Sequence, residues 1–227
     1  MPALRALRPA ALLAAGLLAG CGAVNVQPDS QLPKALVQPV TAHVGLILDD
    51  ELRHFTQQET RSSSDWKVDL GPPHEKMLRY VFESSFSDVH VFNNLEDARA
   101  ASGLQGLFAP HIEQYSFATA EETSASYWAV TIRYRITVYS PQGEPADSLT
   151  LTGYGSVADA GGSGKSLGNA TRAAMRDAAA KILVQMPRQP LTARMAAGEM
   201  LRPGDATALT EQIEAVPIEA EAETPAG

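Results

Sequence analysis

The chain has 227 residues, a formal net charge of −8 and one cysteine. An acidic chain lacks the basic footprint that nucleic-acid binding needs, so we expect no nucleic-acid partner. A single cysteine excludes an internal disulfide and a cysteine-based metal cluster.

The first twenty residues have the three parts of an export signal. Arg5 and Arg8 give a basic start, and residues 10–18 are apolar and uncharged. This apolar run is too short to span a bilayer, which needs about 20 residues, so it fits the core of a signal peptide. We expect residues 1–20 to be removed on export.

The sequence that ends this signal, Leu18-Ala19-Gly20-Cys21, resembles a bacterial lipobox. The resemblance implies cleavage before Cys21 and lipidation of its thiol with several acyl chains such as palmitate. Two or more acyl chains anchor a protein stably. The alternative is an ordinary secretory signal followed by a chance cysteine. By resemblance to the sorting rule of enteric bacteria, Gly22 favours the periplasmic face of the outer membrane.

Two segments flank the predicted domain of residues 40–202. Residues 21–39 hold three prolines and show no sustained apolar period, so we expect a flexible tether. Fully extended, its 18 residues after the cysteine could reach roughly 60 Å. Residues 203–227 carry six acidic and no basic side chains. They hold few large apolar residues, so we expect a disordered acidic tail, with a docking peptide as the alternative.

The first half of the domain mixes strands with one helix. Residues 40–48 are apolar on both faces, which is typical of a central strand in a covered sheet. After two prolines that suit a first helical turn, apolar residues recur at helical spacing between Met77 and Phe86. In chain order we expect a strand at 40–48, a loop at 49–64, a short strand at 66–70, a helix from 71, and a strand at 89–92.

The second half contains the clearest strand. Residues 127–139 alternate strictly between apolar and polar, which predicts one buried and one solvated face. Residues 140–143 have the proline and glycine positions of a tight turn, and residues 149–157 form the return strand. An earlier strand at 104–117 is expected to be interrupted at Pro110, which indicates an edge or a bulge.

A long helix is expected to close the fold. Residues 166–186 place small and apolar side chains along one stripe, and Pro187 ends the helix. Gly153 and Gly155 lie on the inner face of the return strand. They leave room for something bulky, most simply this helix packed across the sheet.

These elements predict an α+β fold, with a mixed or antiparallel sheet of about five strands and two helices packed on one face. The order of elements resembles the TolB N-terminal-like fold of periplasmic envelope proteins, which includes the curli-secretion pore family and the lipoprotein activators of penicillin-binding proteins. The resemblance covers about residues 40–186 and rests on element order without a shared motif. It implies a binding or assembly partner in the envelope, and it transfers no functional residue.

Two sets of residues are candidate partner-binding positions. Tyr115, Phe117, Tyr127 and Trp128 flank a polar loop and could form a binding edge. The alternative is that they cap the core at the base of the hairpin. The second set, Thr131, Arg133 and Arg135, lies on the solvated face of the long strand. It could receive a protein or a glycan, or could be plain surface.

Three patterns that could indicate a catalytic or cofactor site are incomplete in this sequence. The run from Gly161 to Ser166 looks like a phosphate loop, but the motif needs a glycine where Asp159 stands, so we expect no nucleotide. His43 and His90 could lie on neighbouring strands, but we expect no metal site. No Gly-x-Ser-x-Gly elbow marks a nucleophile, so we expect neither a catalytic residue nor a cofactor.

The sequence therefore predicts a non-enzymatic, lipid-anchored envelope protein. It would be held to the membrane by Cys21 and would act as an accessory or assembly factor that binds another envelope protein. A lipid- or lipopolysaccharide-binding component of an envelope transport system is the second hypothesis. A cell-wall hydrolase is the third.

Overall fold

The computed structural model describes residues 23–61, 64–123 and 126–204, which form two sheets and several helices. The strands are β1 (Val24–Val26), β2 (Val40–Ile47), β3 (Thr56–Arg61), β4 (Ser64–Asp69), β5 (Phe86–Phe92), β6 (Gly106–Ala118), β7 (Tyr127–Tyr139) and β8 (Pro145–Ala158). The helices are α1 (Asp50–Arg53), α2 (Gly71–Ser85), α3 (Leu95–Ala100), α4 (Ser163–Gln185) and α5 (Pro190–Ala196), with a 3₁₀ turn η1 (Met186–Arg188).

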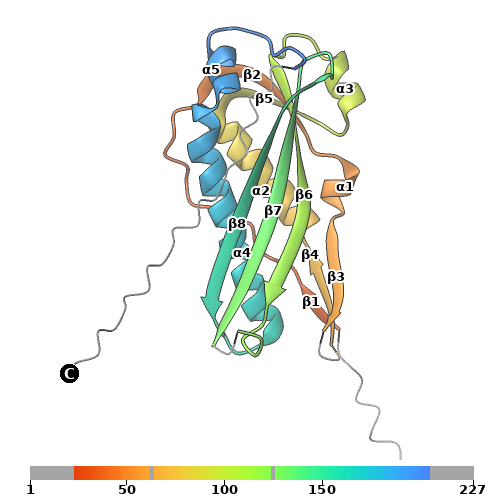
Figure 1. Ribbon diagram of the computed structural model, residues 1–227, viewed down its shortest axis with the longest axis vertical. Coiled ribbons are helices and arrows are strands. Elements are labelled where there is room, and N and C mark those ends of the chain that lie inside the picture. Colours follow the sequence, from red (N-terminus) through yellow and green to blue (C-terminus); the bar gives the residue numbers. More distant parts are fainter. Residues whose placement is uncertain (1–22, 62–63, 124–125, 205–227) are drawn as a thin grey trace, which may run out of the picture.

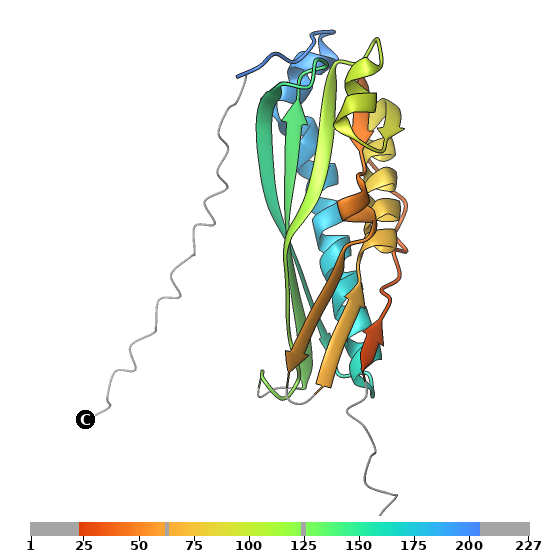
Figure 2. The same cartoon turned by 90° about the vertical axis from the view of Figure 1, so that its right-hand side faces the viewer.

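The larger sheet has five strands in the order β5-β2-β6-β7-β8. Strands β5 and β6 run parallel to β2, whereas β6, β7 and β8 are antiparallel neighbours. Helices α2 and α4 cover one face of this sheet along the long axis of the molecule (Figures 1 and 2). The predicted α+β class is confirmed, with the mixed five-stranded sheet and its two helices.

A second sheet of three strands, in the order β1-β4-β3, was not predicted. It lies at the end of the molecule where α4 begins, which we call the lower end, as drawn in Figure 1. Its Trp66 packs against Phe117 of β6 and Trp128 of β7, with ring centroids 5.2 and 5.8 Å apart. The small sheet therefore joins the core of the large one through aromatic contacts.

The alternating strand is confirmed. All six apolar side chains that were expected to point inward are buried, and the polar positions between them are partly or fully exposed. The buried six are Trp128, Val130, Ile132, Tyr134, Ile136 and Val138.

The expected interruption at Pro110 is wrong, since β6 runs through this residue. Pro110 pairs with Ile136 of β7, and the pairing between β6 and β2 ends two residues earlier, at Phe108. A proline is tolerated where only one neighbouring strand is bonded. The irregularity of β6 lies further on, as a bulge between Ile112 and Gln114.

The two glycines of β8 bring α4 against the sheet, as expected from the sequence. A Cβ atom at residue 153 would lie 2.3 Å from the backbone oxygen of Ala174. At residue 155 it would lie 2.3 Å from the backbone oxygen of Ala170. Helix α4 therefore contacts the strand backbone directly, and only a residue without a side chain fits at either position.

The expected tether is corrected by the structure, because residues 23–39 lie against the domain. Strand β1 pairs with β4 in parallel, with Val24 opposite Trp66, and Val26 is buried. Further along, the Tyr80 hydroxyl accepts from the Ala35 N–H at 2.6 Å and donates to the Pro33 carbonyl at 2.9 Å. A three-residue strand gives no sustained sequence period, and these hydrogen bonds use backbone groups that any residue could supply.

The expected loop at 49–64 contains helix α1 and strand β3. Asp49 caps α1 by accepting from the Leu52 N–H at 2.9 Å. Strand β3 reads Thr-Gln-Gln-Glu-Thr-Arg, and it pairs along its whole length with β4. None of the residues of β3 is fully buried, so the strand has no apolar face. Its sequence therefore gave no alternating pattern by which it could be predicted.

The chain continues as ordered structure after α4. Met195 and Leu201 pack over Gly106, where an added Cβ atom would lie 2.7 Å from the Leu201 side chain. The buried Gln105 amide donates to the Met195 carbonyl at 2.6 Å. The C-terminal segment thus completes the core beside β6, and the predicted acidic tail lies outside the described residues from 205 onward.

One polar contact sits at the centre of the core. His74 is fully buried, with Nδ1 at 2.6 Å from the Leu70 carbonyl and Nε2 at 2.7 Å from the Tyr134 hydroxyl. Because a carbonyl only accepts, the ring carries a proton on Nδ1. Burial lowers the pKa of His74 from 6.5 to about 4.

We predict that Gly155→Ala lowers the free energy of unfolding by about 3 kcal/mol, because the added methyl group overlaps the backbone of α4. Urea denaturation measures this change. Gly168→Ala is the matched control, since its Cβ would meet only Val26 at an ordinary 3.5 Å. Inside a helix this control should stabilise the protein by up to about 1 kcal/mol. Equal losses in both variants would contradict the close packing.

We also predict that the protein loses about 2 kcal/mol of stability between pH 7 and pH 5 through His74. Unfolded chains take up a proton on this ring below its ordinary pKa of 6.5, whereas the folded state resists protonation until about pH 4. Stability therefore falls as the pH falls through this window. Denaturation of the double variant His74→Phe, Tyr134→Phe should show a flatter pH dependence, and an unchanged slope would contradict this assignment.

Candidate functional site

The structure separates the four aromatic residues that were predicted as a binding edge. Tyr115, Phe117 and Trp128 are buried in the hydrophobic core, whereas Tyr127 is 53% exposed. The Tyr115 hydroxyl donates to Thr171 at 2.7 Å, since the Thr171 hydroxyl donates its own hydrogen to Leu167. Three of the four thus match the alternative that they cap the core.

The second predicted set lies where it was expected, on the solvated face of β7. Arg133 and Arg135 both form ion pairs with Glu113 of the β6 bulge, Arg133 at 3.1 Å. Tyr154 of β8 stands opposite Thr131 and is 56% exposed. We call this surface of β6, β7 and β8 the open face.

Little of the described chain covers the open face. Helix α3 packs at its upper end, where Ala98 contributes to a small apolar cluster with Leu107 and Ala109. Below α3 no described helix or strand lies over β6, β7 and β8 (Figure 2). A polar sheet surface with paired charges is therefore accessible from solvent.

The free edge of β8 is protected, in contrast. The Tyr154 backbone N–H donates to the Asp177 carboxylate at 2.8 Å. The Lys181 ammonium donates to the Thr152 carbonyl at 2.7 Å. Both side chains come from α4, so they occupy backbone groups that an added strand would need.

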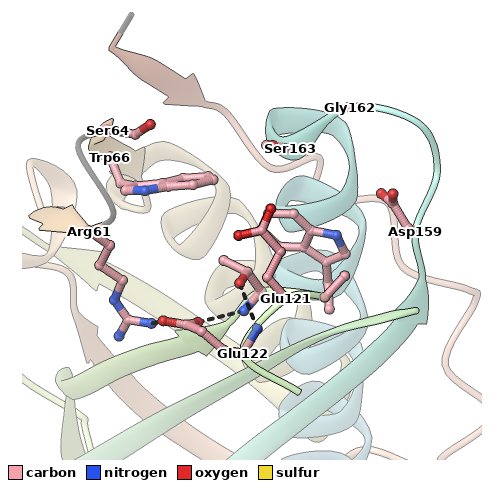
Figure 3. A pocket seen from close by; sticks show the side chains of 11 residues that line it. Arg61, Ser64, Trp66, Glu121, Glu122, Asp159, Gly162 and Ser163 are labelled. Carbon is pink, nitrogen blue, oxygen red and sulfur yellow. Dashed lines mark hydrogen bonds and ion pairs between the residues drawn. The ribbon is translucent and has the colours of Figure 1, made fainter. Parts of the chain in front are cut away.

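A pocket of 330 Å³ opens at the lower end, between the two sheets and the start of α4. Figure 3 shows Arg61, Ser64 and Trp66 on one side and Asp159, Gly162 and Ser163 on the other. We call it the tryptophan pocket. Its lining comes from Arg61, Ser64, Trp66, Thr119, Ala120, Glu121, Glu122, Trp128, Asp159, Gly162 and Ser163.

Both indole N–H groups of this pocket lack hydrogen bonds within the described chain. Trp66 and Trp128 are 7% and 5% exposed, and neither Nε1 atom has a partner there. The Trp128 N–H interacts with the Asp159 carboxylate and contributes to lowering the pKa of that group. Both Nε1 atoms are themselves buried, so the two indoles form part of the pocket wall without presenting a donor to its interior.

Two carboxylates of the pocket, Glu122 and Asp159, are held in the ionised form. Thr119 donates its backbone N–H to Glu122, which lowers the pKa of that carboxyl. The Ser166 hydroxyl donates to Asp159 at 2.5 Å and lowers the pKa of that carboxyl. Both groups therefore act as hydrogen-bond acceptors at neutral pH.

Arg61 is fixed at the rim rather than free to meet a ligand. Its guanidinium donates to the Phe117 carbonyl at 2.7 Å and pairs with Glu59 at 2.6 Å and Glu122 at 3.2 Å. It also lies over the Phe117 ring, 4.4 Å from the centroid. The cation is used to hold β3, β6 and the loop after β6 together.

The phosphate-loop look-alike has a structural explanation in this pocket. Ser166 accepts from the Ala160 backbone N–H at 2.9 Å while it donates to Asp159. Gly162 precedes α4 with φ of 139° and provides no side-chain cap. The run therefore forms the turn from β8 into α4.

His43 and His90 lie on neighbouring strands, as the sequence suggested. Their ring nitrogens contact the same oxygen of Asp88, at 2.8 and 3.2 Å. The hydrogen bond from His43 lowers the pKa of Asp88. All three side chains are exposed, and the described residues contain no group of three that could hold a metal ion.

Sequence reasoning missed the tryptophan pocket, although one signal pointed to it. The chain has only two tryptophans, and both line this cavity. Their positions, 66 and 128, belong to different sheets, and Asp159 follows a third strand. Only the packing of the small sheet on the large one brings them together.

No protein-family model and no curated protein matches this sequence. Its fold is similar to the crystal structure of a DUF330 protein from Xanthomonas campestris, with a TM-score of 0.50 and 10% identity over 78% of this chain and 99% of that one. A minor lipoprotein from Acinetobacter baumannii matches with a TM-score of 0.37 and 13% identity, over 73% and 100% of the two chains. A homolog of neuraminyllactose-binding hemagglutinin from Helicobacter pylori gives 0.42 and 11%, over 76% and 97%.

The first of these similarities shows a shared α+β fold. The resemblance to the TolB N-terminal-like fold stays a prediction, because none of these three structures is described by that name. None of the described helices is both long enough and apolar enough to cross a bilayer.

Proposed function

We propose that the chain is a lipid-anchored, non-enzymatic envelope protein of the outer membrane that binds another envelope protein through the open face. The observation that carries this proposal is the exposed arrangement of Arg133, Arg135 and Tyr154 on a rigid sheet. Arginine and tyrosine are enriched where proteins bind each other, and fixed side chains lose little entropy on binding.

The structure favours the face of the sheet over its edge as the binding surface. A partner that adds a strand to β8 would need the backbone groups of residues 152 and 154. Lys181 and Asp177 already bond to these groups. The open face carries no such cover below α3, and it keeps its charges in place through Glu113.

The anchor proposed at Cys21 would hold the domain close to the membrane. Only two residues, Gly22 and Ala23, separate Cys21 from Val24, which is fixed in the small sheet. The three steps of extended chain from Cys21 to Val24 span roughly 10 Å. The lower end would therefore face the bilayer, and the strands of the open face would rise away from it.

The lipid-transport hypothesis needs a groove between the helices and the sheet. Along β8 this space is filled, since α4 touches the strand backbone at Gly153 and Gly155. A hydrolase of glycans needs a carboxyl whose pKa is raised so that it can donate a proton. In the tryptophan pocket the pKa of Glu122 and of Asp159 is lowered. Both observations favour binding of a partner over these two alternatives.

We predict that photoreactive residues at Arg133 and Tyr154 crosslink to one dominant envelope protein in living cells, because both positions lie on the open face. Mass spectrometry of the adducts identifies the partner. Position 184, an exposed valine on the outer side of α4, is the matched control and should give no dominant adduct. The same adducts from all three positions, or adducts only with lipid, would contradict the proposal.

We predict that energy transfer from the two tryptophans to a dansylated lipid headgroup is strong when the lipidated protein is bound to vesicles. A 20-residue Gly-Ser linker inserted after Gly22 should reduce it, because such a linker spans about 25 Å on average. Equally strong energy transfer with and without the linker would contradict the proposal that a short anchor holds the lower end against the bilayer.

A further inference from the structure

A groove of 570 Å³ runs along α4, between this helix and the chain that leads from β1 to β2. Arg172 and Arg176 of α4 line one side of it, and residues 31–33 together with Val157 of β8 line the other. We call it the α4 groove. Helix α4 covers the face of the large sheet that lies opposite the open face, and the groove shares no lining residue with the tryptophan pocket. It is therefore a separate surface of the molecule.

The two arginines of the α4 groove stand one helical turn apart. Residues four positions apart lie on the same side of a helix, so both guanidinium groups border the same space. Arg176 is exposed, and it forms no ion pair or hydrogen bond within the part of the chain that the structure describes. All five of its N–H donors are therefore available to a ligand.

Arg172 is only partly engaged by its neighbours. Its guanidinium donates one hydrogen bond to the side-chain oxygen of Asn169. It also lies 3.9 Å from the carboxylate of Asp29, with the two side chains 36% and 43% exposed. A long ion pair between exposed groups contributes little. Since a guanidinium has five N–H donors, Arg172 keeps donors for a ligand as well.

The charge of the α4 groove favours an anion. Its lining contains two arginines and no acidic residue, in a chain with a net charge of −8. Lys34, a further exposed cation, directly follows the groove residue Pro33 in the chain. The planar fork of a guanidinium matches the oxygens of a phosphate or a carboxylate. A phosphate ester presents three acceptor oxygens and up to two charges, so it can engage both arginines at once.

The rest of the lining suits an apolar substituent on this phosphate. Leu32 and Val157 are half-buried and pack against the hydrophobic core. They leave part of their apolar surface in the groove beside the two cations. The volume of 570 Å³ lies within the range of small-molecule sites. The groove therefore has room for a charged group and for a short apolar chain.

We propose that the α4 groove binds a phosphate ester that carries an apolar group, with Arg172 and Arg176 holding its phosphate oxygens. Binding occurs without any covalent step. The site does not depend on the protein partner proposed for the open face.

Such a phosphate has two sources in an envelope: a soluble phosphate ester or the headgroup of a membrane phospholipid. Strand β1 lies beside the first turns of α4, where a Cβ atom at residue 168 would lie 3.5 Å from Val26. With Cys21 lipidated, the groove would begin within roughly 20 Å of the anchor, counted along the extended chain and the helix. The experiment below therefore presents the phosphate in both forms.

Isothermal titration calorimetry measures this binding on the mature protein, purified from cells in a neutral detergent. The soluble probes are inorganic phosphate, butyl phosphate and butyrate. The lipid probes are dihexanoyl phosphatidylglycerol, which is anionic, and dihexanoyl phosphatidylcholine, which is zwitterionic. We expect butyl phosphate to bind with a dissociation constant of roughly 0.1 to 1 mM. It should bind more tightly than inorganic phosphate, which has no apolar group, and than butyrate, which has fewer acceptor oxygens and less charge.

Three variants test the roles of the arginines. Arg176→Gln and Arg172→Gln should each weaken the binding of butyl phosphate about tenfold, because hydrogen bonds between charged groups are the strong ones. Arg176→Lys keeps the charge and loses the fork, so its affinity should lie between those of the parent and of Arg176→Gln. The thermal unfolding of both variants at residue 176 should match the parent, since this side chain has no partner in the described chain. Arg188→Gln, at an exposed arginine just beyond α4, is the matched control and should bind like the parent.

Several results would overturn the proposal. They are no heat of binding with butyl phosphate or with phosphatidylglycerol, an affinity for butyrate equal to that for butyl phosphate, or binding that Arg172→Gln and Arg176→Gln leave unchanged. An equal loss in Arg188→Gln would also overturn it, because net charge alone would then explain the binding. Tighter binding of phosphatidylglycerol than of butyl phosphate would identify a lipid headgroup as the ligand, and the reverse order would identify a soluble ester. Crosslinking through the open face is measured separately, so failure of one proposal leaves the other intact.

Discussion

The direct contact between α4 and the backbone of β8 is the constraint on which the remaining structure depends. Two residues without side chains, Gly153 and Gly155, let the helix approach until Ala170 and Ala174 touch the strand. This approach fixes the start of α4 beside the end of β8 at the lower end. It also places Asp177 and Lys181 next to the free edge of β8, where they bond to its backbone. One packing contact thus positions the pocket and protects the edge.

Much of the large sheet could be predicted from the sequence because its signals are local. Strict alternation over thirteen residues identified β7, and Pro141 and Gly143 marked the turn that follows. In that turn the Gly143 N–H donates to the Ser140 carbonyl at 2.9 Å. Of the small sheet, only β4 was expected, as the short strand at 66–70. Strand β3 is polar on both sides, and β1 is three residues long. Their formation depends on pairing with β4, which is a tertiary property.

The tryptophan pocket shows the same limit for a site. Arg133 and Arg135 could be assigned to a solvated face because side chains alternate between the two faces along one strand. Trp66, Trp128 and Asp159 come from segments that only the fold brings together, so no spacing connects them. Of the four aromatic residues predicted as a binding edge, Trp128 lines the tryptophan pocket. Its burial and its interaction with Asp159 became visible only in the fold.

The short distance from Cys21 to β1 would fix how the open face and the tryptophan pocket lie relative to the membrane. A long tether would let the domain turn freely, and both surfaces could then face any direction. With Val24 fixed beside Trp66, the lipid would instead set one orientation. The pocket would lie at the bilayer, and the open face would extend from it along strands of 13 and 14 residues, roughly 45 Å at the usual rise. A partner protein could therefore reach the open face from the periplasm while the pocket remains next to the membrane.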